Sequence, residues 1–202
     1  MAHVCRDAMG KLVFVTGGAR SGKSHFAETL ARRHPGRVCY IATAVIADEE
    51  MARRVTVHRQ RRPAHWSTLE CPVGLAIGLT QAALNHDLLL VDCLTLYLAQ
   101  FLPADLPQDT ELTSDVEEKI HQQVDEEMTL ILTAVRRIAA DVIIVSNEVG
   151  SGLVPPYPTG RLFRDMMGYA NQVLAREADW AYVVIAGMPL DLKALRASTM
   201  PW

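Results

Sequence analysis

Residues 17–24 combine residue types that bind phosphate, in the spacing Gly-x-x-x-x-Gly-Lys-Ser. Glycines let backbone N–H groups approach the oxygens of a phosphate chain, and the start of a helix adds partial positive charge. Lys23 can reach the β- and γ-phosphates of a nucleoside triphosphate, and Ser24 can ligate Mg²⁺. An ordinary glycine turn is the alternative. An apolar strand pattern before the loop and a helix pattern after it favour phosphate binding.

A phosphate loop of this kind also needs a carboxylate at the end of a neighbouring strand, to hold the metal or its waters. Asp92 directly follows the apolar run 88–91 and can supply it. The alternative is that a buried strand simply has to end in a polar residue. Glu148, which follows the apolar run 142–146, competes for the same role.

A histidine framed by arginines lies on a predicted helix over residues 48–61. Arg54, His58 and Arg62 are spaced four residues apart, so they share one face of a helix. Guanidiniums bind polyphosphates, and their positive field favours the neutral imidazole, the form that can attack phosphorus. Such an attack would give a phosphoramidate and divide a transfer into two steps. The alternative is a solvated surface histidine; His65, beside Trp66, has no better claim to the role.

Short apolar runs rich in Val, Ile and Leu alternate with helix-length segments along most of the chain. This pattern is typical of parallel strands covered on both faces, so we expect an α/β protein of three layers. The expected strands are 12–16, 38–42, 88–91, 142–146 and 181–185, and the expected helices run from the glycine loop to about residue 33 and over 48–61, 73–84, 95–102 and 115–140. Residues 103–114 and 150–160 are proline-containing loops, and long loops often line sites.

Bulk composition narrows the class of protein. The 202 residues suit one domain, half of them are hydrophobic, and a net charge of -3 gives no basic field for nucleic acid. The longest apolar stretch, 88–102, is shorter than a membrane span, so we expect no stable membrane insertion. Four scattered cysteines without a C-x-x-C pair fit a reduced cytoplasm. Residues 1–10 lack the apolar segment of a secretory signal.

At this point the chain resembles the bifunctional adenosylcobinamide kinase and adenosylcobinamide-phosphate guanylyltransferase family of cobalamin biosynthesis. The resembling segments cover most of residues 12–187 in the expected order: 15–24, 40–43, 50–55, 58–59, 62–66, 146–150, 154–155, 161–165 and 171–172. The resemblance implies a RecA-like P-loop NTPase fold with a mainly parallel sheet. It divides the chain into an N-terminal extension (1–10), a kinase/guanylyltransferase domain (11–187) and a C-terminal tail (188–202).

The resemblance also implies two reactions at one nucleotide site, with Mg²⁺. In the first, adenosylcobinamide takes the γ-phosphoryl of ATP or GTP; in the second, GTP gives GMP to adenosylcobinamide phosphate through His58, yielding adenosylcobinamide-GDP and pyrophosphate. By this likeness Lys23 and His58 are catalytic, and Ser24 and Asp92 hold the metal. The implied nucleotide contacts are Gly17, Gly18, Ala19, Arg20, Ser21, Gly22, Lys23, Ser24, Ala42, Thr43, Ala44, Arg59, Gln60, Arg61, Arg62, Glu70 and Asp92.

The chain departs from the family pattern at two places, and two kinds of function other than the bifunctional enzyme stay open. Position 92 is more often glutamate in the family, and residues 59–62 are more basic than in some relatives. The chain could perform only the kinase or only the guanylyl transfer, or it could be a regulatory module that uses the phosphate loop as a switch. The likeness implies a homo-oligomer, with three subunits expected, and no partner of nucleic acid.

Overall fold

A computed structural model gives the fold of the chain and describes residues 9–45, 49, 53, 59, 62–103 and 112–197. Its sheet has the strand order β3-β2-β4-β5-β1-β6-β7, and every neighbouring pair is parallel except β6 and β7. The strands are β1 (Leu12–Gly17), β2 (Val38–Ala42), β3 (Ser67–Glu70), β4 (Leu88–Asp92), β5 (Asp141–Asn147), β6 (Trp180–Ile185) and β7 (Met188–Asp191).

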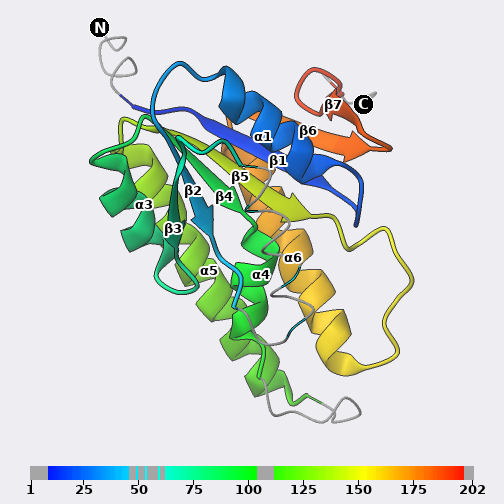
Figure 1. Ribbon diagram of the computed structural model, residues 1–202. Helices are drawn as coiled ribbons and strands as arrows, with labels where there is room; N and C mark the ends of the chain where they lie inside the picture. Colours follow the sequence, from blue (N-terminus) through cyan, green and yellow to red (C-terminus); the bar gives the residue numbers. More distant parts are fainter. Residues whose placement is uncertain are drawn as a thin grey trace, which may run out of the picture.

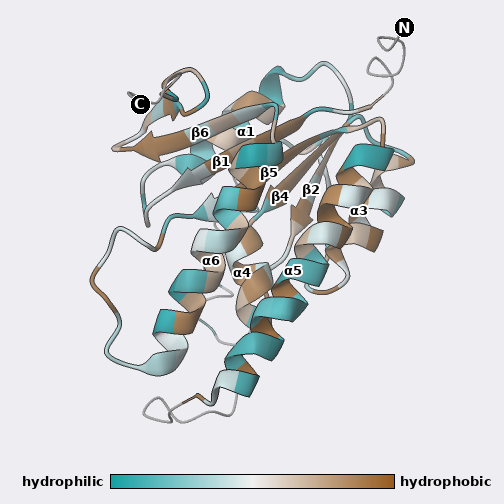
Figure 2. Cartoon of the chain, turned by 180° about the vertical axis from the view of Figure 1, so that it is seen from behind, coloured by the Kyte–Doolittle hydropathy of each residue, from teal (hydrophilic) through white to brown (hydrophobic). Residues whose placement is uncertain are grey.

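Helices cover both faces of this sheet, which confirms the three-layer α/β fold. Figure 1 shows α1 on one face, and Figure 2, seen from behind, shows the other helices on the opposite face with their hydrophilic sides outward. The helices are α1 (Lys23–Arg33), α3 (Leu75–Ala83), α4 (Leu94–Leu98), the 3₁₀ turn η1 (Ala99–Phe101), α5 (Ser114–Arg137) and α6 (Pro158–Glu177). In the described part of the chain, no helix is both long and apolar enough to span a membrane.

Two apolar cores follow from the alternation of side chains along the strands. In β1, Leu12 and Phe14 point into the larger core, shared with α3 to α6, whereas Val15 points into the smaller core beneath α1. The strands are buried on both faces, which explains why they read as continuous apolar runs. Trp66 also packs into the smaller core, as its sequence context indicated.

Most expected elements are confirmed, with small differences at their ends. All five expected strands are present. On α5 the apolar residues Ile120, Val124, Met128, Ile131 and Val135 are buried, whereas Val116 is 36% exposed. The expected helix 95–102 is divided into α4 and η1. The expected helix 48–61 falls almost wholly outside the described residues.

Three elements were not predicted. These are the edge strand β3, the helix α6 and the edge strand β7, of which β7 pairs antiparallel with β6. Residues 188–191, which the sequence assigned to a terminal tail, therefore belong to the sheet. The expected loop 150–160 is correct up to residue 157, after which α6 begins.

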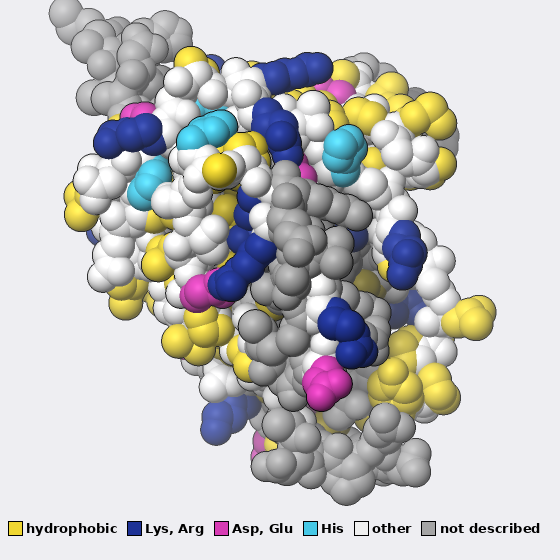
Figure 3. Space-filling model, viewed as in Figure 1, with side chains coloured by type: hydrophobic (Ala, Val, Ile, Leu, Met, Phe, Trp, Pro, Cys, Tyr) yellow, Lys and Arg dark blue, Asp and Glu magenta, His cyan; other side chains and the backbone are white. Residues whose placement is uncertain are grey.

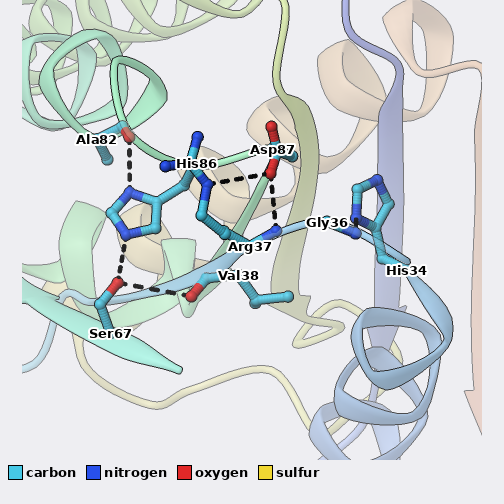
Figure 4. Close-up of polar contacts among 8 residues, drawn as sticks. All are labelled: His34, Gly36, Arg37, Val38, Ser67, Ala82, His86 and Asp87. Carbon is cyan, nitrogen blue, oxygen red and sulfur yellow. Dashed lines mark hydrogen bonds and ion pairs between the residues drawn. The ribbon is translucent and has the colours of Figure 1, made fainter. Parts of the chain in front are cut away.

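The amino ends of the strands are joined by polar contacts between connecting segments (Figure 4). Asp87 accepts the backbone N–H of Arg37 at 2.8 Å, and its side chain also pairs with the Arg37 guanidinium. His86 bridges Ser67 Oγ (2.6 Å) and the Ala82 carbonyl (2.8 Å). The polar side chains at the amino edge of the sheet are therefore used in contacts between segments. The candidate site lies at the opposite, carboxyl edge.

Candidate active site

The phosphate loop joins the end of β1 to the first turn of α1, as the sequence predicted. Gly22 precedes the helix at φ 97°, a left-handed conformation that favours glycine. A Cβ there would lie 3.2 Å from the Gly187 Cα, and a Cβ on Gly17 would lie 2.5 Å from the Val184 carbonyl oxygen. These two glycines are therefore required by the close approach of β6 and the β6–β7 turn to the loop.

Lys23, Ser24 and Asp92 come together at the carboxyl edge of the sheet. Ser24 Oγ lies 3.4 Å from Asp92 Oδ1, so a hydroxyl and a carboxylate converge across 68 residues of sequence. Lys23 Nζ donates to the Gly18 carbonyl at 3.2 Å. Burial lowers the pKa of Lys23, and the nearby Cys93 and Asp92 oppose that shift. The pair Ser24 and Asp92 suits Mg²⁺, which takes few protein oxygens and keeps waters and phosphate oxygens as its other ligands.

Tyr40, on β2, holds the Asp92 carboxylate, and the sequence did not single it out. Its hydroxyl donates to Asp92 Oδ2 at 2.9 Å, while the Arg62 guanidinium lies over its ring, 3.3 Å from the centroid. Burial and the charge of Asp92 raise the pKa of Tyr40, so it keeps its proton and remains a donor. In the β2–β4 pairing Ala42 lies opposite Asp92, and Tyr40, two residues earlier on the same face of β2, reaches the carboxylate with its hydroxyl.

The remaining nucleotide candidates lie along β2 and β3. Arg59 forms an ion pair with Glu70, and Arg62 donates to Thr68 Oγ1 at 3.4 Å while its buried Nε has no partner among the described residues. Thr43 is fully buried and donates its hydroxyl to the Cys93 carbonyl at 2.7 Å. The Thr43 side chain therefore stabilises the segment directly after β4, and only the backbone of Thr43 is available to bind a ligand.

Glu148, the competing carboxylate, is engaged within its own loop. Its Oε1 accepts the backbone N–H groups of Gly150 (2.6 Å) and Ser151 (3.0 Å). Its own N–H donates to the Gly17 carbonyl at 3.0 Å, so it anchors the segment after β5 to the phosphate loop. Asp92, next to Ser24, has the better geometry for a metal.

A group of positively charged side chains lies on the face of the molecule that carries α1. Figure 3 shows Lys and Arg side chains through the middle of this face, with His side chains nearby. Burial raises the pKa of the neighbouring Cys93 thiol to about 11, with the charge of Asp92 adding to the effect. Cys93 therefore stays protonated and is a poor nucleophile. The chemistry that this site offers comes from its cations and from the Asp92 carboxylate beside Ser24.

The family model for cobinamide kinase / cobinamide phosphate guanyltransferase, CobU, matches residues 13–192. The chain belongs to this family. The bifunctional adenosylcobalamin biosynthesis protein CobP of Pseudomonas aeruginosa is 41% identical over 179 residues, covering 89% of this chain and 95% of that protein. CobU proteins of Salmonella typhimurium (39% identical) and Escherichia coli (38%) align with 90% of this chain and 99% of their own lengths. The resemblance seen in the sequence is confirmed.

The CobU-family match extends through β7, which supports counting residues 188–191 with the domain. Three residues that the resemblance assigned to the site, His58, Gln60 and Arg61, lie outside the described residues, as does Arg54, which helix spacing placed beside His58. Their roles stay predictions. Lys23, Ser24 and Asp92 come together, and Arg62 joins them through Tyr40.

A network of buried polar side chains at the end of β5, next to the site, was also not predicted from the sequence. Ser146 Oγ donates to Asn171 Oδ1 at 2.7 Å, and Asn171 Nδ2 donates to the Asn147 carbonyl at 2.9 Å. Thr95 Oγ1 accepts the Asn147 N–H at 2.7 Å. The network ties α4 and α6 to the end of β5, next to the phosphate loop. The sequence showed these residues only as separate matches.

Proposed function

We propose that this chain carries out both reactions of its family in cobalamin biosynthesis. It phosphorylates adenosylcobinamide with ATP or GTP, then transfers GMP from GTP to adenosylcobinamide phosphate, giving adenosylcobinamide-GDP and pyrophosphate. The observation that carries this proposal is the convergence of Lys23, Ser24 and Asp92 at the phosphate loop. The family match supplies the identity of the acceptor.

In the kinase step, the side-arm hydroxyl of adenosylcobinamide attacks the γ-phosphorus. The new O–P bond forms as the bond between the γ-phosphorus and the β–γ bridging oxygen breaks. The nucleoside diphosphate leaves with those electrons, and the hydroxyl proton passes to solvent. Lys23 and the backbone N–H groups of the loop neutralise the phosphate chain. Ser24 and Asp92 would hold Mg²⁺, which supplies charge neutralisation at the β- and γ-phosphates. Tyr40 keeps Asp92 oriented.

In the guanylyl step, His58 is the proposed nucleophile. Its imidazole attacks the α-phosphorus of GTP, a P–N bond forms, the α–β bridge breaks and pyrophosphate leaves. A phosphate oxygen of adenosylcobinamide phosphate then attacks the same phosphorus and releases the imidazole. Two observations support a guanine nucleotide beside β2 and β3: the Arg59–Glu70 pair, and Arg62 on the Tyr40 ring.

A labelling experiment tests the histidine. The protein is incubated with Mg²⁺ and GTP labelled at the α-phosphorus, then denatured and probed for an acid-labile, base-stable label. We expect label in the wild type and in the exposed-histidine control His65→Ala, and none in His58→Ala. Label that persists in His58→Ala would refute the histidine mechanism. A wild type that hydrolyses or transfers nothing would favour the regulatory module.

The kinase step is tested with γ-labelled ATP or GTP and adenosylcobinamide. We expect His58→Ala to keep this transfer, because the histidine acts at the α-phosphorus. Lys23→Ala should weaken both reactions by at least about a hundredfold, since both use the same triphosphate cradle. Transfer in only one assay by the wild type would instead identify a monofunctional enzyme.

We further propose that the protein works in the cytoplasm with Mg²⁺ as its ion and assembles as a homo-oligomer, with three subunits expected from the family likeness. The buried, free thiols of Cys39, Cys71 and Cys93 support a reducing compartment. Removal of Mg²⁺ with EDTA should stop both reactions, and Mg²⁺ addition should restore them. Sedimentation velocity would give the subunit number.

A further inference from the structure

The loop between β5 and α6, residues 148–157, presents the most exposed apolar side chain among the described residues. Leu153 is 97% exposed and the adjacent Val154 is 65% exposed. Figure 1 shows this loop leaving the carboxyl edge of the sheet and returning to the start of α6. Figure 3 shows hydrophobic side chains on the side of the molecule where the loop runs. These two adjacent side chains present a small apolar surface to water.

The loop is held firmly at its first end. Glu148 accepts two backbone N–H groups of the loop, and Arg164 of α6 donates to the Gly150 carbonyl at 2.7 Å. Val149 packs against the larger core. The exposed pair therefore follows a fixed stem that starts at the phosphate loop.

The second end of the loop is equally constrained. Arg161 donates to the carbonyls of Pro155 (3.3 Å) and Pro156 (2.8 Å). Tyr157 and Pro155 lie so close to Gly160 that a Cβ there would come within 2.5 Å of the Tyr157 ring. Because both ends are fixed, Leu153 and Val154 are presented in a set position. A surface ordered before binding loses little conformational entropy on binding.

The position of the loop indicates which substrate it meets. The Glu148 N–H bonds the Gly17 carbonyl, so the loop begins at the phosphate loop. In the sheet order β5 lies between β4, which carries Asp92, and β1. The metal ion of a nucleoside triphosphate binds its β- and γ-phosphates. With that ion at Asp92 on β4 and the phosphates on the loop after β1, the γ-phosphorus would lie near the end of β5, the strand between them. An acceptor that attacks this phosphorus in line must lie beyond the γ-phosphate, on the side away from the nucleoside.

We propose that Leu153 and Val154 form the docking surface for the corrin ring of the acceptor, adenosylcobinamide. This inference rests on the proposed function and adds to it the place of the large substrate. The corrin macrocycle is broad and carries methyl groups between the amide side chains of its rim, so it offers apolar contacts there, whereas its side-arm hydroxyl must reach the γ-phosphorus. The loop fits both needs, because its apolar part is exposed and its stem adjoins the phosphate loop. If the ring docks there, its binding energy holds the side-arm hydroxyl in position to attack the γ-phosphorus.

The test is a steady-state comparison of the wild type with the double variant Leu153→Ser/Val154→Ser. We expect KM for adenosylcobinamide to rise about tenfold, from the lost apolar contact area, with KM for ATP or GTP unchanged. Labelling of the protein by α-labelled GTP should also be unchanged, because that half-reaction needs no corrinoid. Leu84→Ser, at a 78% exposed leucine after α3, is the matched control and should change neither KM.

Two further measurements keep the proposal open to refutation. With 1-amino-2-propanol, an acceptor that lacks the ring, the double variant and the wild type should transfer at the same low rate. An unchanged KM for adenosylcobinamide in an active double variant would overturn the proposal. So would loss of the oligomer in sedimentation velocity with the corrinoid KM retained, because the surface would then be a subunit contact. Failure of the proposed function would differ, since the wild type itself would transfer no phosphoryl group.

Discussion

Tyr40→Phe removes one hydroxyl from the site and leaves the rest of the side chain. The variant deletes the 2.9 Å hydrogen bond to Asp92 Oδ2 but keeps the ring on which the Arg62 guanidinium lies. Asp92 would keep Ser24 Oγ as its neighbour at 3.4 Å and lose its shorter contact. We therefore expect a specific loss of carboxylate orientation, with the phosphate loop and the cation–π contact preserved.

The expected magnitude follows from that hydrogen bond. A hydrogen bond to a charged group contributes about 1.5–3 kcal/mol, and loss of a residue that orients a metal ligand costs about 10- to 100-fold in metal affinity or activity. We expect the Mg²⁺ concentration at half-maximal kinase rate to rise by about that factor in Tyr40→Phe. The free energy of unfolding should fall by about 1.5–3 kcal/mol, because the hydrogen bond that is lost joins a buried tyrosine to a carboxylate.

The assay is γ-phosphoryl transfer measured across a Mg²⁺ titration at saturating nucleotide. Tyr182→Phe is the matched control, because Tyr182 lies on β6 and packs edge-on against Phe26, away from Asp92. It should leave the Mg²⁺ dependence unchanged. If Tyr40→Phe, folded as judged by urea unfolding, also showed the wild-type Mg²⁺ dependence and kcat, Asp92 would not act as the oriented metal carboxylate.

Three more predictions follow from the site. Burial lowers the pKa of Lys23 below 10.5 in the free protein and a bound triphosphate raises it again, so the affinity for triphosphate should fall as pH rises through the lowered pKa. Calorimetric titration across pH would show this, and Lys23→Arg should move the fall to higher pH. Gly22→Ala should cost about 1–3 kcal/mol in urea unfolding and slow both reactions, since φ is 97° and Gly187 is close. Asn171→Ala should cost about 1–3 kcal/mol, because Ser146 loses its 2.7 Å acceptor and keeps only Thr95 Oγ1 at 3.5 Å, and the Asn147 carbonyl loses its donor; a wild-type unfolding midpoint would contradict this.

The phosphate loop and its carboxylate could be predicted because both are local signals. The Gly-x-x-x-x-Gly-Lys-Ser spacing and the carboxylate after an apolar strand can each be recognised from a few neighbouring residues. That Asp92 rather than Glu148 faces Ser24 depends on strand order and on the Glu148 contacts with its own loop, which no local pattern reveals. Tyr40 and Asp92 are joined by the β2–β4 pairing, a contact 52 residues apart.

The three elements that were not predicted from the sequence all have weak local signals of secondary structure. β3 is a short edge strand of mostly exposed residues, and β7 contains Pro189, which is tolerated because β7 is also at an edge. The helix α6 begins with Pro158 and contains Gly160 and Gly168, so its start resembled a continuing loop. Each was decided by tertiary packing: α6 buries Met166, Met167 and Leu174 in the larger core.

The strand order also explains how one phosphate loop could serve two nucleophiles. His58 lies in the connection from β2 to β3, whereas the proposed corrin surface follows β5. Because β4 lies between β2 and β5, Asp92 separates the two connections at the carboxyl edge. A histidine arriving from the β2 side and a hydroxyl arriving from the β5 side would approach the triphosphate from opposite sides of the metal carboxylate. The two reactions can then share Lys23, Ser24 and Asp92 while attacking different phosphorus atoms. On this argument His58→Ala impairs the guanylyl transfer alone, and Leu153→Ser/Val154→Ser weakens use of the corrinoid without changing labelling of the histidine, whereas Lys23→Ala impairs both reactions.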